Sequence, residues 1–205
     1  MKSLKLAILT LFHPITTFNY IKRERTTISK LPILIILVIC VVNRIIEIYF
    51  THYPLATIDV RDANMLWECS KIVVPVLTWT IASYAITTII DGETLLSEAA
   101  LAISYSMMPL VVFSVPLTLL SRVLEASQGG LYYGLSAAVY GWILLLMVIN
   151  LKELNHYSGK KTLVIILLSL FTFAIIWATV ALFFSISMQF ITFVKEVLVE
   201  ARYKF

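Results

Sequence analysis

Five long apolar runs constrain the fold of this sequence more than any other feature. Each run is near or above the roughly 20 residues that cross a hydrocarbon core as a helix. In order along the chain, the runs cover about residues 31–50, 70–90, 99–121, 131–150 and 162–194. Of the 205 residues, 60% are apolar and 14% are charged, and the mean hydropathy of +0.93 exceeds that of soluble domains. The sequence therefore predicts an all-α integral membrane protein, built as a five-transmembrane-helix bundle over residues 31–194.

The first 30 residues are expected to form a cytoplasmic or interfacial amphipathic segment. The stretch from Leu4 to Tyr20 is apolar with polar residues between, and Pro14 interrupts it too early for a membrane span. A basic stretch from Ile21 to Arg25 follows, and such stretches stay in the cytoplasm. At the other end, residues 195–205 predict an amphipathic helical tail outside the membrane, and the long fifth run must tilt, bend or project.

The distribution of basic residues predicts an N-in, C-out orientation. With the N-terminus inside, the cytoplasmic segments hold Lys2, Lys5, Lys22, Arg23, Arg25, Lys30, Lys152, Lys160 and Lys161. The outer segments then hold Arg61, Lys71, Arg122, Lys195, Arg202 and Lys204. Because cytoplasmic loops carry the excess of Lys and Arg, the larger first set favours this orientation.

Three polar residues lie inside the first run. Asn43 and Glu47 are four residues apart and Arg44 and Glu47 are three apart, so all three share one helix face that must avoid lipid. We favour an ion pair or an arginine that reaches the interface, with a packing role. The alternative is a binding or conduction role.

The third run should be kinked. It contains Pro109 and Pro116, and each proline removes a backbone donor and crowds the preceding turn. Nearby hydroxyls, on Ser104, Tyr105, Ser106 and Ser114, are available to the freed carbonyl groups. A kinked packing helix is the favoured interpretation, and a substrate-binding discontinuity is the alternative.

The fourth run carries a stripe of small residues. Gly134, Ala138 and Gly141 recur at a spacing that places them on one helix face, where another helix can approach closely. That helix belongs either to this chain, which we favour, or to another protein.

Enzyme function has no support in the sequence. Neither a phosphate-binding loop, a G-x-S-x-G elbow, an H-E-x-x-H pair nor a dinucleotide fingerprint occurs. His13, His52 and His156 share no face in the expected topology, so we expect no metal site and no cofactor. The basic residues lie between apolar runs rather than on one soluble module, so no nucleic-acid partner is expected.

Two loops and the third run carry a resemblance to a known family. The loop Asp91-Gly92-Glu93 is followed by a helix with Tyr105, Ser106 and Pro109, then Pro116, and a later loop reads His156-Tyr157-Ser158. In combination these features resemble the Yip1-domain family, and the last loop resembles its branch from Gram-positive bacteria. The resemblance covers nearly the whole chain.

The resemblance implies five transmembrane helices with a cytoplasmic N-terminus. Eukaryotic members are adaptors in vesicle traffic that bind prenylated small GTPases. This sequence departs from them because it lacks their long soluble N-terminal region, which puts GTPase binding in doubt. Bacterial relatives often accompany carbohydrate ABC-transport systems, which implies an accessory subunit in the bacterial cytoplasmic membrane.

We therefore expect a non-enzymatic accessory or scaffold protein that sits in the lipid bilayer and associates with other integral membrane proteins. ABC-transporter permeases are candidate partners, and a homo-oligomer is compatible with the sequence. The alternative is a small transporter or channel that acts alone. Such proteins usually show internal repeats and broken, glycine-rich helices, whereas this chain has six glycines and no visible inverted repeat.

Overall fold

The computed structural model of the chain describes residues 2–24, 28–53, 55–56 and 58–204 and, within these ranges, the side chains from 5 to 200 except that of 198. Arg25 of the basic stretch therefore lies outside the described residues, as do the side chains of Lys2, Arg202 and Lys204.

The described residues are almost entirely helical. The helices are α1 (Lys2–Phe12), α2 (Pro14–Arg23), α3 (Leu31–Phe50), α4 (Met65–Ile89), α5 (Leu96–Ser106), α6 (Met108–Leu120), the 3-10 turn η1 (Ala126–Gln128), α7 (Gly129–Asn155) and α8 (Gly159–Lys204). Within the described residues, five segments are long and apolar enough to span a membrane: Leu31–Phe50, Met65–Ile89, Leu96–Leu120, Ala126–Asn155 and Gly159–Val197. The predicted five-helix membrane class is confirmed.

Local chemistry explains where several helices begin and end. At the start of α4, the side chain of Asn64 accepts a hydrogen bond from the backbone N–H of Trp67 over 3.2 Å, which satisfies an otherwise free donor. At the end of α7, His156 has a left-handed backbone with φ of 51°, a conformation that stops a helix.

The third span is broken into α5 and α6 at Met107. Its backbone N–H bonds to the carbonyl of Ser104 over 3.1 Å, a tighter turn than an α-helix makes. Pro109 follows within the first turn of α6, where its missing N–H is harmless. The predicted kink of this run is confirmed, and it lies just before the first of the two prolines.

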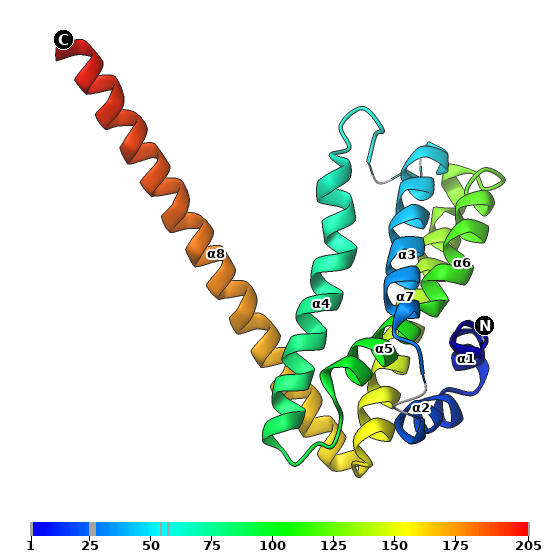
Figure 1. The fold of residues 1–205 in the computed structure, drawn as a ribbon. Helices are drawn as coiled ribbons and strands as arrows, with labels where there is room; N and C mark the ends of the chain where they lie inside the picture. Colours follow the sequence, from blue (N-terminus) through cyan, green and yellow to red (C-terminus); the bar gives the residue numbers. More distant parts are fainter. Residues whose placement is uncertain (1, 25–27, 54, 57, 205) are drawn as a thin grey trace.

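The membrane helices connect at two ends of the molecule (Figure 1). The end that holds α2, the loop 90–95 and the loop 156–158 is called the lower end. The upper end holds the loops 51–64 and 121–128 and, farther out, the C-terminus of α8. The N-in, C-out orientation rests on the distribution of basic residues and stays a prediction.

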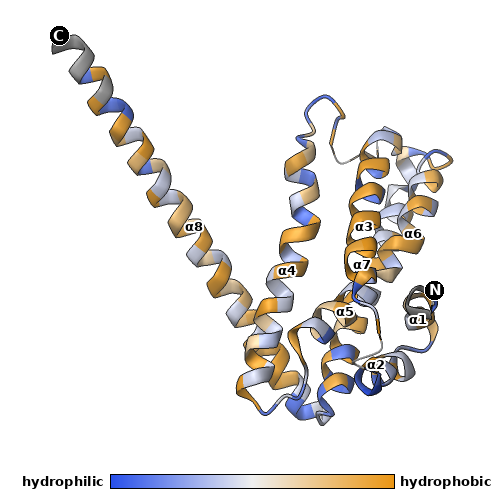
Figure 2. Ribbon diagram, in the orientation of Figure 1, coloured by the Kyte–Doolittle hydropathy of each residue, from blue (hydrophilic) through white to orange (hydrophobic). Residues whose placement is uncertain are grey.

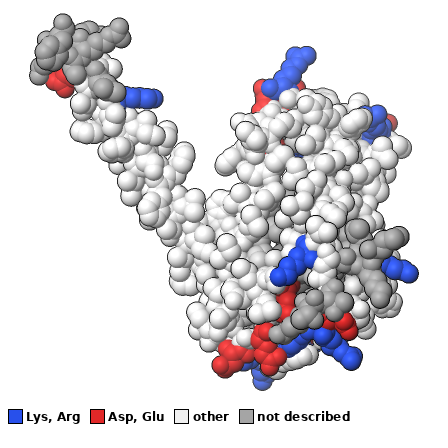
Figure 3. Space-filling view, in the orientation of Figure 1, with Lys and Arg blue, Asp and Glu red and all other residues white. Residues whose placement is uncertain are grey.

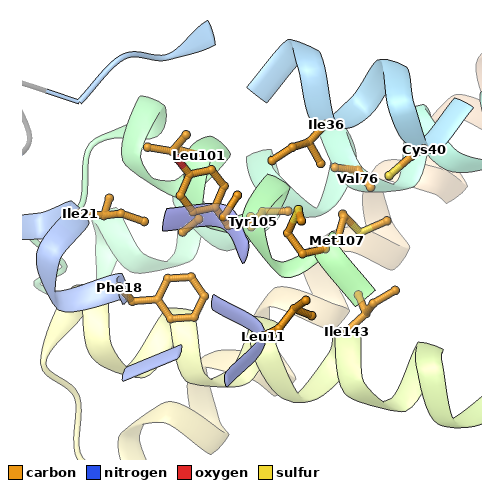
Figure 4. Close-up of a cluster of buried hydrophobic side chains, with 14 of the residues drawn as sticks. Leu11, Phe18, Ile21, Ile36, Cys40, Val76, Leu101, Tyr105, Met107 and Ile143 are labelled. Carbon is orange, nitrogen blue, oxygen red and sulfur yellow. The ribbon is translucent and has the colours of Figure 1, made fainter. Parts of the chain in front are cut away.

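The core lies where the N-terminal helices meet the lower half of the bundle (Figure 4). Phe18 and Ile21 of α2 and Tyr105 of α5 are fully buried, and α1 adds Leu11 at 6% exposure. The predicted amphipathic segment is thus two helices separated at His13, and its apolar side packs against the protein.

Helix α8 leaves the bundle. It crosses α4 at the lower end and then diverges from it (Figure 1), and its 46 residues make a rod of about 69 Å against a hydrocarbon core of about 30 Å. Among its described side chains after residue 173, none is buried. We call the part of α8 beyond residue 173 the arm. Figure 2 shows that the arm is apolar along most of its length, and in Figure 3 the charges of the arm lie only near its tip. Helix α8 thus continues into the predicted tail as far as Lys204, whereas the position of this tail outside the membrane stays a prediction.

Candidate functional site

The two family-motif loops meet at the lower end. We call the residues 90–95 and 155–158 the lower clasp. Asp91 has a left-handed backbone with φ of 50°, and the N–H of Gly92 bonds to the carbonyl of Thr87 over 2.7 Å. A methyl group on Gly92 would lie 2.5 Å from that carbonyl and 2.8 Å from both the Asn155 amide oxygen and the Tyr157 hydroxyl. Only glycine fits there, because the second loop closes over it.

Side chains from both segments fasten the lower clasp. The Tyr157 hydroxyl donates to the carbonyl of Ile90 over 3.0 Å, and the Thr94 hydroxyl donates to Asn155 Oδ1 over 2.7 Å. Burial raises the pKa of the Tyr157 phenol above its usual range, and the negative charge of Asp91 adds to the rise. The neutral phenol, which can donate, is therefore the form that the fold favours.

Two polar contacts attach α2 to the loop 90–95 and to α7. Lys22 Nζ lies 2.7 Å from Glu93 Oε2, and Asn19 Nδ2 donates to Glu153 Oε2 over 3.0 Å. The Glu93 side chain is 70% exposed, so this ion pair contributes little stability. Its position nevertheless ties the motif loop to the basic stretch.

The remaining motif residues also have packing roles. Asn150 Nδ2 on α7 donates to Ser106 Oγ on α5 over 3.0 Å, beside the fully buried Tyr105. Ser158 Oγ accepts from the backbone N–H of Lys161 at the start of α8, over 3.4 Å. The motif residues thus pack the lower half of the bundle.

The polar residues of the first run form a second cluster, toward the upper end. Arg44 lies between two carboxylates: its Nη1 is 2.9 Å from Glu47 Oε2 and its Nη2 is 2.7 Å from Glu68 Oε2 on α4. Lys71, one turn after Glu68, pairs with the other oxygen of that carboxylate. We call Arg44, Glu47, Glu68 and Lys71 the upper charge cluster. The cluster holds two positive and two negative groups that pair with one another, as is usual for charged side chains within a membrane.

The sequence predicted part of this cluster. The ion pair between Arg44 and Glu47 is confirmed, and Asn43 on the same face donates to the carbonyl of Val111 on α6 over 3.0 Å. Glu68 was missed because the second run was placed at 70–90, whereas α4 begins at Met65. Lys71 was assigned to the outer basic residues, without Glu68 as its partner. The three-residue spacing of Glu68 and Lys71 was the available signal.

The small-residue stripe of α7 does not pack inside the chain. Gly134, Ala138 and Gly141 are exposed, and a methyl group added to either glycine would meet nothing within 4 Å. The favoured expectation, a helix of this chain against the stripe, is wrong, because α7 turns Ile143 and Leu146 to the bundle instead.

A cavity of about 780 Å³ lies between α3, α4, α6, α7 and α8, next to the upper charge cluster. Arg44, Glu47 and Lys71 line its upper part, and its lower part is apolar, with Trp79 and Met147 in the wall. A hollow of about 280 Å³ lies on the other side of Arg44 and Glu47. Among the described residues, no three His, Cys, Asp or Glu side chains are placed to hold a metal ion.

Comparison with known proteins identifies the family. The family model of the Yip1 domain matches residues 8–186. No match was found among curated proteins or among solved structures. Because the matched stretch takes in both motif loops and most of the chain, the chain belongs to the Yip1-domain family, and the predicted resemblance is confirmed. The bacterial branch stays a prediction.

Proposed function

We propose that this Yip1-domain membrane protein is a non-enzymatic accessory or scaffold protein that binds other integral membrane proteins. The observation that carries the proposal is the arm of α8 beyond residue 173, where none of the described side chains is buried and nearly all are exposed. A membrane helix that leaves its own bundle offers its full circumference to other helices.

One polar residue on this arm supports a protein partner over lipid alone. Gln189 is exposed, and no hydrogen bond within the described chain engages its amide, whereas Ser187 donates to its own helix at the carbonyl of Phe183 over 2.8 Å. Side-chain amides in membrane helices bond across helix interfaces, where they find the partners that lipid lacks. The exposed stripe at Gly134 and Gly141 is a second face that permits close helix approach.

The partner class follows from the family resemblance. The bacterial branch accompanies carbohydrate ABC-transport systems, so permeases of such a system, in a bacterial cytoplasmic membrane, are the partners to test first. A second copy of the chain, which would make a homo-oligomer, is the other partner to test.

The second candidate function is a small transporter that acts alone. The cavity of about 780 Å³ with its charged upper part favours it, because ligand sites have volumes of about 300–1,000 Å³ and combine apolar walls with a few polar groups. The two candidates differ in what the purified chain does without partners.

Purification in mild detergent, with identification of co-eluting membrane proteins, tests the proposal. We expect Gln189→Leu to reduce co-elution and Ser187→Leu to leave it unchanged, since the Ser187 hydroxyl is already satisfied. Both variants should insert and remain monodisperse. Solute flux by the purified chain in liposomes, without any co-eluting protein, would contradict the scaffold function and favour the transporter.

A further inference from the structure

We propose that the cavity beside the upper charge cluster binds one glycerophospholipid with a zwitterionic head. The head lies at Arg44, Glu47 and Lys71, and an acyl chain fills the apolar part below. This site is independent of the partner surface on α8. Its volume, about 780 Å³, falls within the roughly 300–1,000 Å³ of typical ligand sites.

The cavity has the polarity and direction of a lipid in the membrane. Lys71, Pro75 and Trp79 line it at four-residue intervals, so it extends about 12 Å along α4. Lys71 lies in the second turn of α4, near the upper end of the span, and Trp79 lies two turns deeper. Charged groups therefore lie toward the level of the lipid heads and apolar groups at the level of the chains.

Buried polar atoms in the wall lack partners within the described chain. Ser114 is 8% exposed, and its hydroxyl oxygen makes no hydrogen bond; the indole N–H of Trp79 makes none either. Both residues line the cavity. A buried donor without an acceptor is costly. Both atoms are closed to the cavity in this side-chain arrangement, so a side-chain rotation toward the cavity would let a ligand atom satisfy each of them. Ser114 lies on α6, seven residues after Met107, toward the charged part of the cavity, where an ester oxygen of the lipid would accept a hydrogen bond from its hydroxyl.

The charges of the cluster match a head that carries both a phosphate and an ammonium group. Lys71 uses one ammonium proton on Glu68, which leaves donors for phosphate oxygens. Glu47 gives one oxygen to Arg44, which leaves the other for an ammonium group. With Glu68 included, the cluster sums to zero, so it has no excess positive charge to select an anionic head.

The walls leave a lateral route for a lipid. On α8 the lining residues end at Phe173, which packs against Trp79 with ring centroids 6.3 Å apart. Above this contact α8 diverges from α4 (Figure 1), and the surface between them is uncharged in Figure 3.

Quenching of Trp79 by lipids with brominated chains tests the site. The full chain would carry Trp79 as its only tryptophan, with Phe at the other three, in nanodiscs of phosphatidylcholine that contain a minor fraction of brominated phosphatidylethanolamine or phosphatidylglycerol. A chain with only Trp142, which is 42% exposed and outside the cavity wall, reports contact with bulk lipid. We expect Trp79 to be quenched severalfold more than Trp142, and more by phosphatidylethanolamine than by phosphatidylglycerol.

Variants separate the head contact from the chain contact. Met147→Phe narrows the cavity and should abolish the excess quenching, whereas Leu145→Phe, an exposed position on the same helix, should not. Glu47→Gln leaves the cluster with one positive charge and should reverse the preference toward phosphatidylglycerol. Equal quenching of Trp79 and Trp142, no quenching of Trp79, or a native preference for phosphatidylglycerol would overturn the proposal.

Discussion

The hydroxyl of Tyr157, in the loop after α7, donates a hydrogen bond to the carbonyl of Ile90, at the end of α4, over 3.0 Å. This bond joins two helical hairpins whose loops are 67 residues apart in the sequence. Both loops belong to the motif that identifies the family, so the motif residues serve first of all to hold the lower end of the bundle together.

Gly92→Ala should destabilise the protein because its new methyl group would overlap Thr87, Asn155 and Tyr157. Overpacking of this kind costs about 1–3 kcal/mol. Thermal unfolding in detergent measures the change, and Gly159→Ala, at a position with open space, is the control. Equal melting temperatures for the two variants would show that the lower clasp is looser than described.

The lower clasp should weaken at high pH. The folded pKa of Tyr157 is raised, so its stabilising contribution is present below the unfolded pKa of about 10 and is lost as the pH rises through the folded value. At neutral pH, Tyr157→Phe should be about 1 kcal/mol less stable to unfolding than the parent. Above pH ~10, its free energy of unfolding should fall less steeply than that of the parent. Tyr53→Phe, at a side chain 82% exposed, should follow the parent curve. Parallel curves for Tyr157→Phe and the parent would rule out this linkage.

The upper charge cluster should behave as a unit. Arg44→Leu leaves Glu47 and the 3% exposed Glu68 with a single cation, and breaking a buried pair costs about 3–5 kcal/mol. The double variant Arg44→Leu with Glu68→Leu restores neutrality and should be more stable than Arg44→Leu alone. Thermal unfolding of both single variants and the double variant measures the coupling, and additive losses would mean that the charges act separately.

The two chain ends should lie on opposite sides of the membrane, with the N-terminus inside. Five spans require opposite sides, and the basic stretch that contains Lys22 and Arg23 favours the cytoplasm for the lower end. Reporter fusions at residue 1 and residue 205 measure the side of each end. Reporters on the same side would contradict the five-span topology.

The sequence predicted those features of the fold that depend on the length of apolar runs or on the spacing of nearby residues. The five spans follow from hydropathy, the break at Met107 from Pro109, and the pair of Arg44 with Glu47 from their spacing. The spans depend on the composition of about 20 consecutive residues, and the break and the ion pair depend on neighbours within one helical turn.

The sequence could not predict which face of a membrane helix turns inward. Lipid and protein interior are equally apolar, so Gly134 and Gly141 gave no signal that they point outward. Contacts such as Thr94 with Asn155 join residues 61 apart and arise only when the hairpins meet. Glu68 belongs to the site because α4 begins at Met65, before its apolar run. The polar residues in this first part of the helix gave no hydropathy signal for where the helix starts.

The central claim, that α8 holds another membrane protein, is tested most directly by photo-crosslinking from its uncovered arm. A photoreactive amino acid would replace Phe183 or Phe190, both more than 60% exposed, and Phe173, which faces Trp79, would serve as the inward control. After irradiation of intact membranes, we predict adducts with a second protein from residues 183 and 190 and none from residue 173. Adducts with lipid alone at both outer positions would contradict the claim.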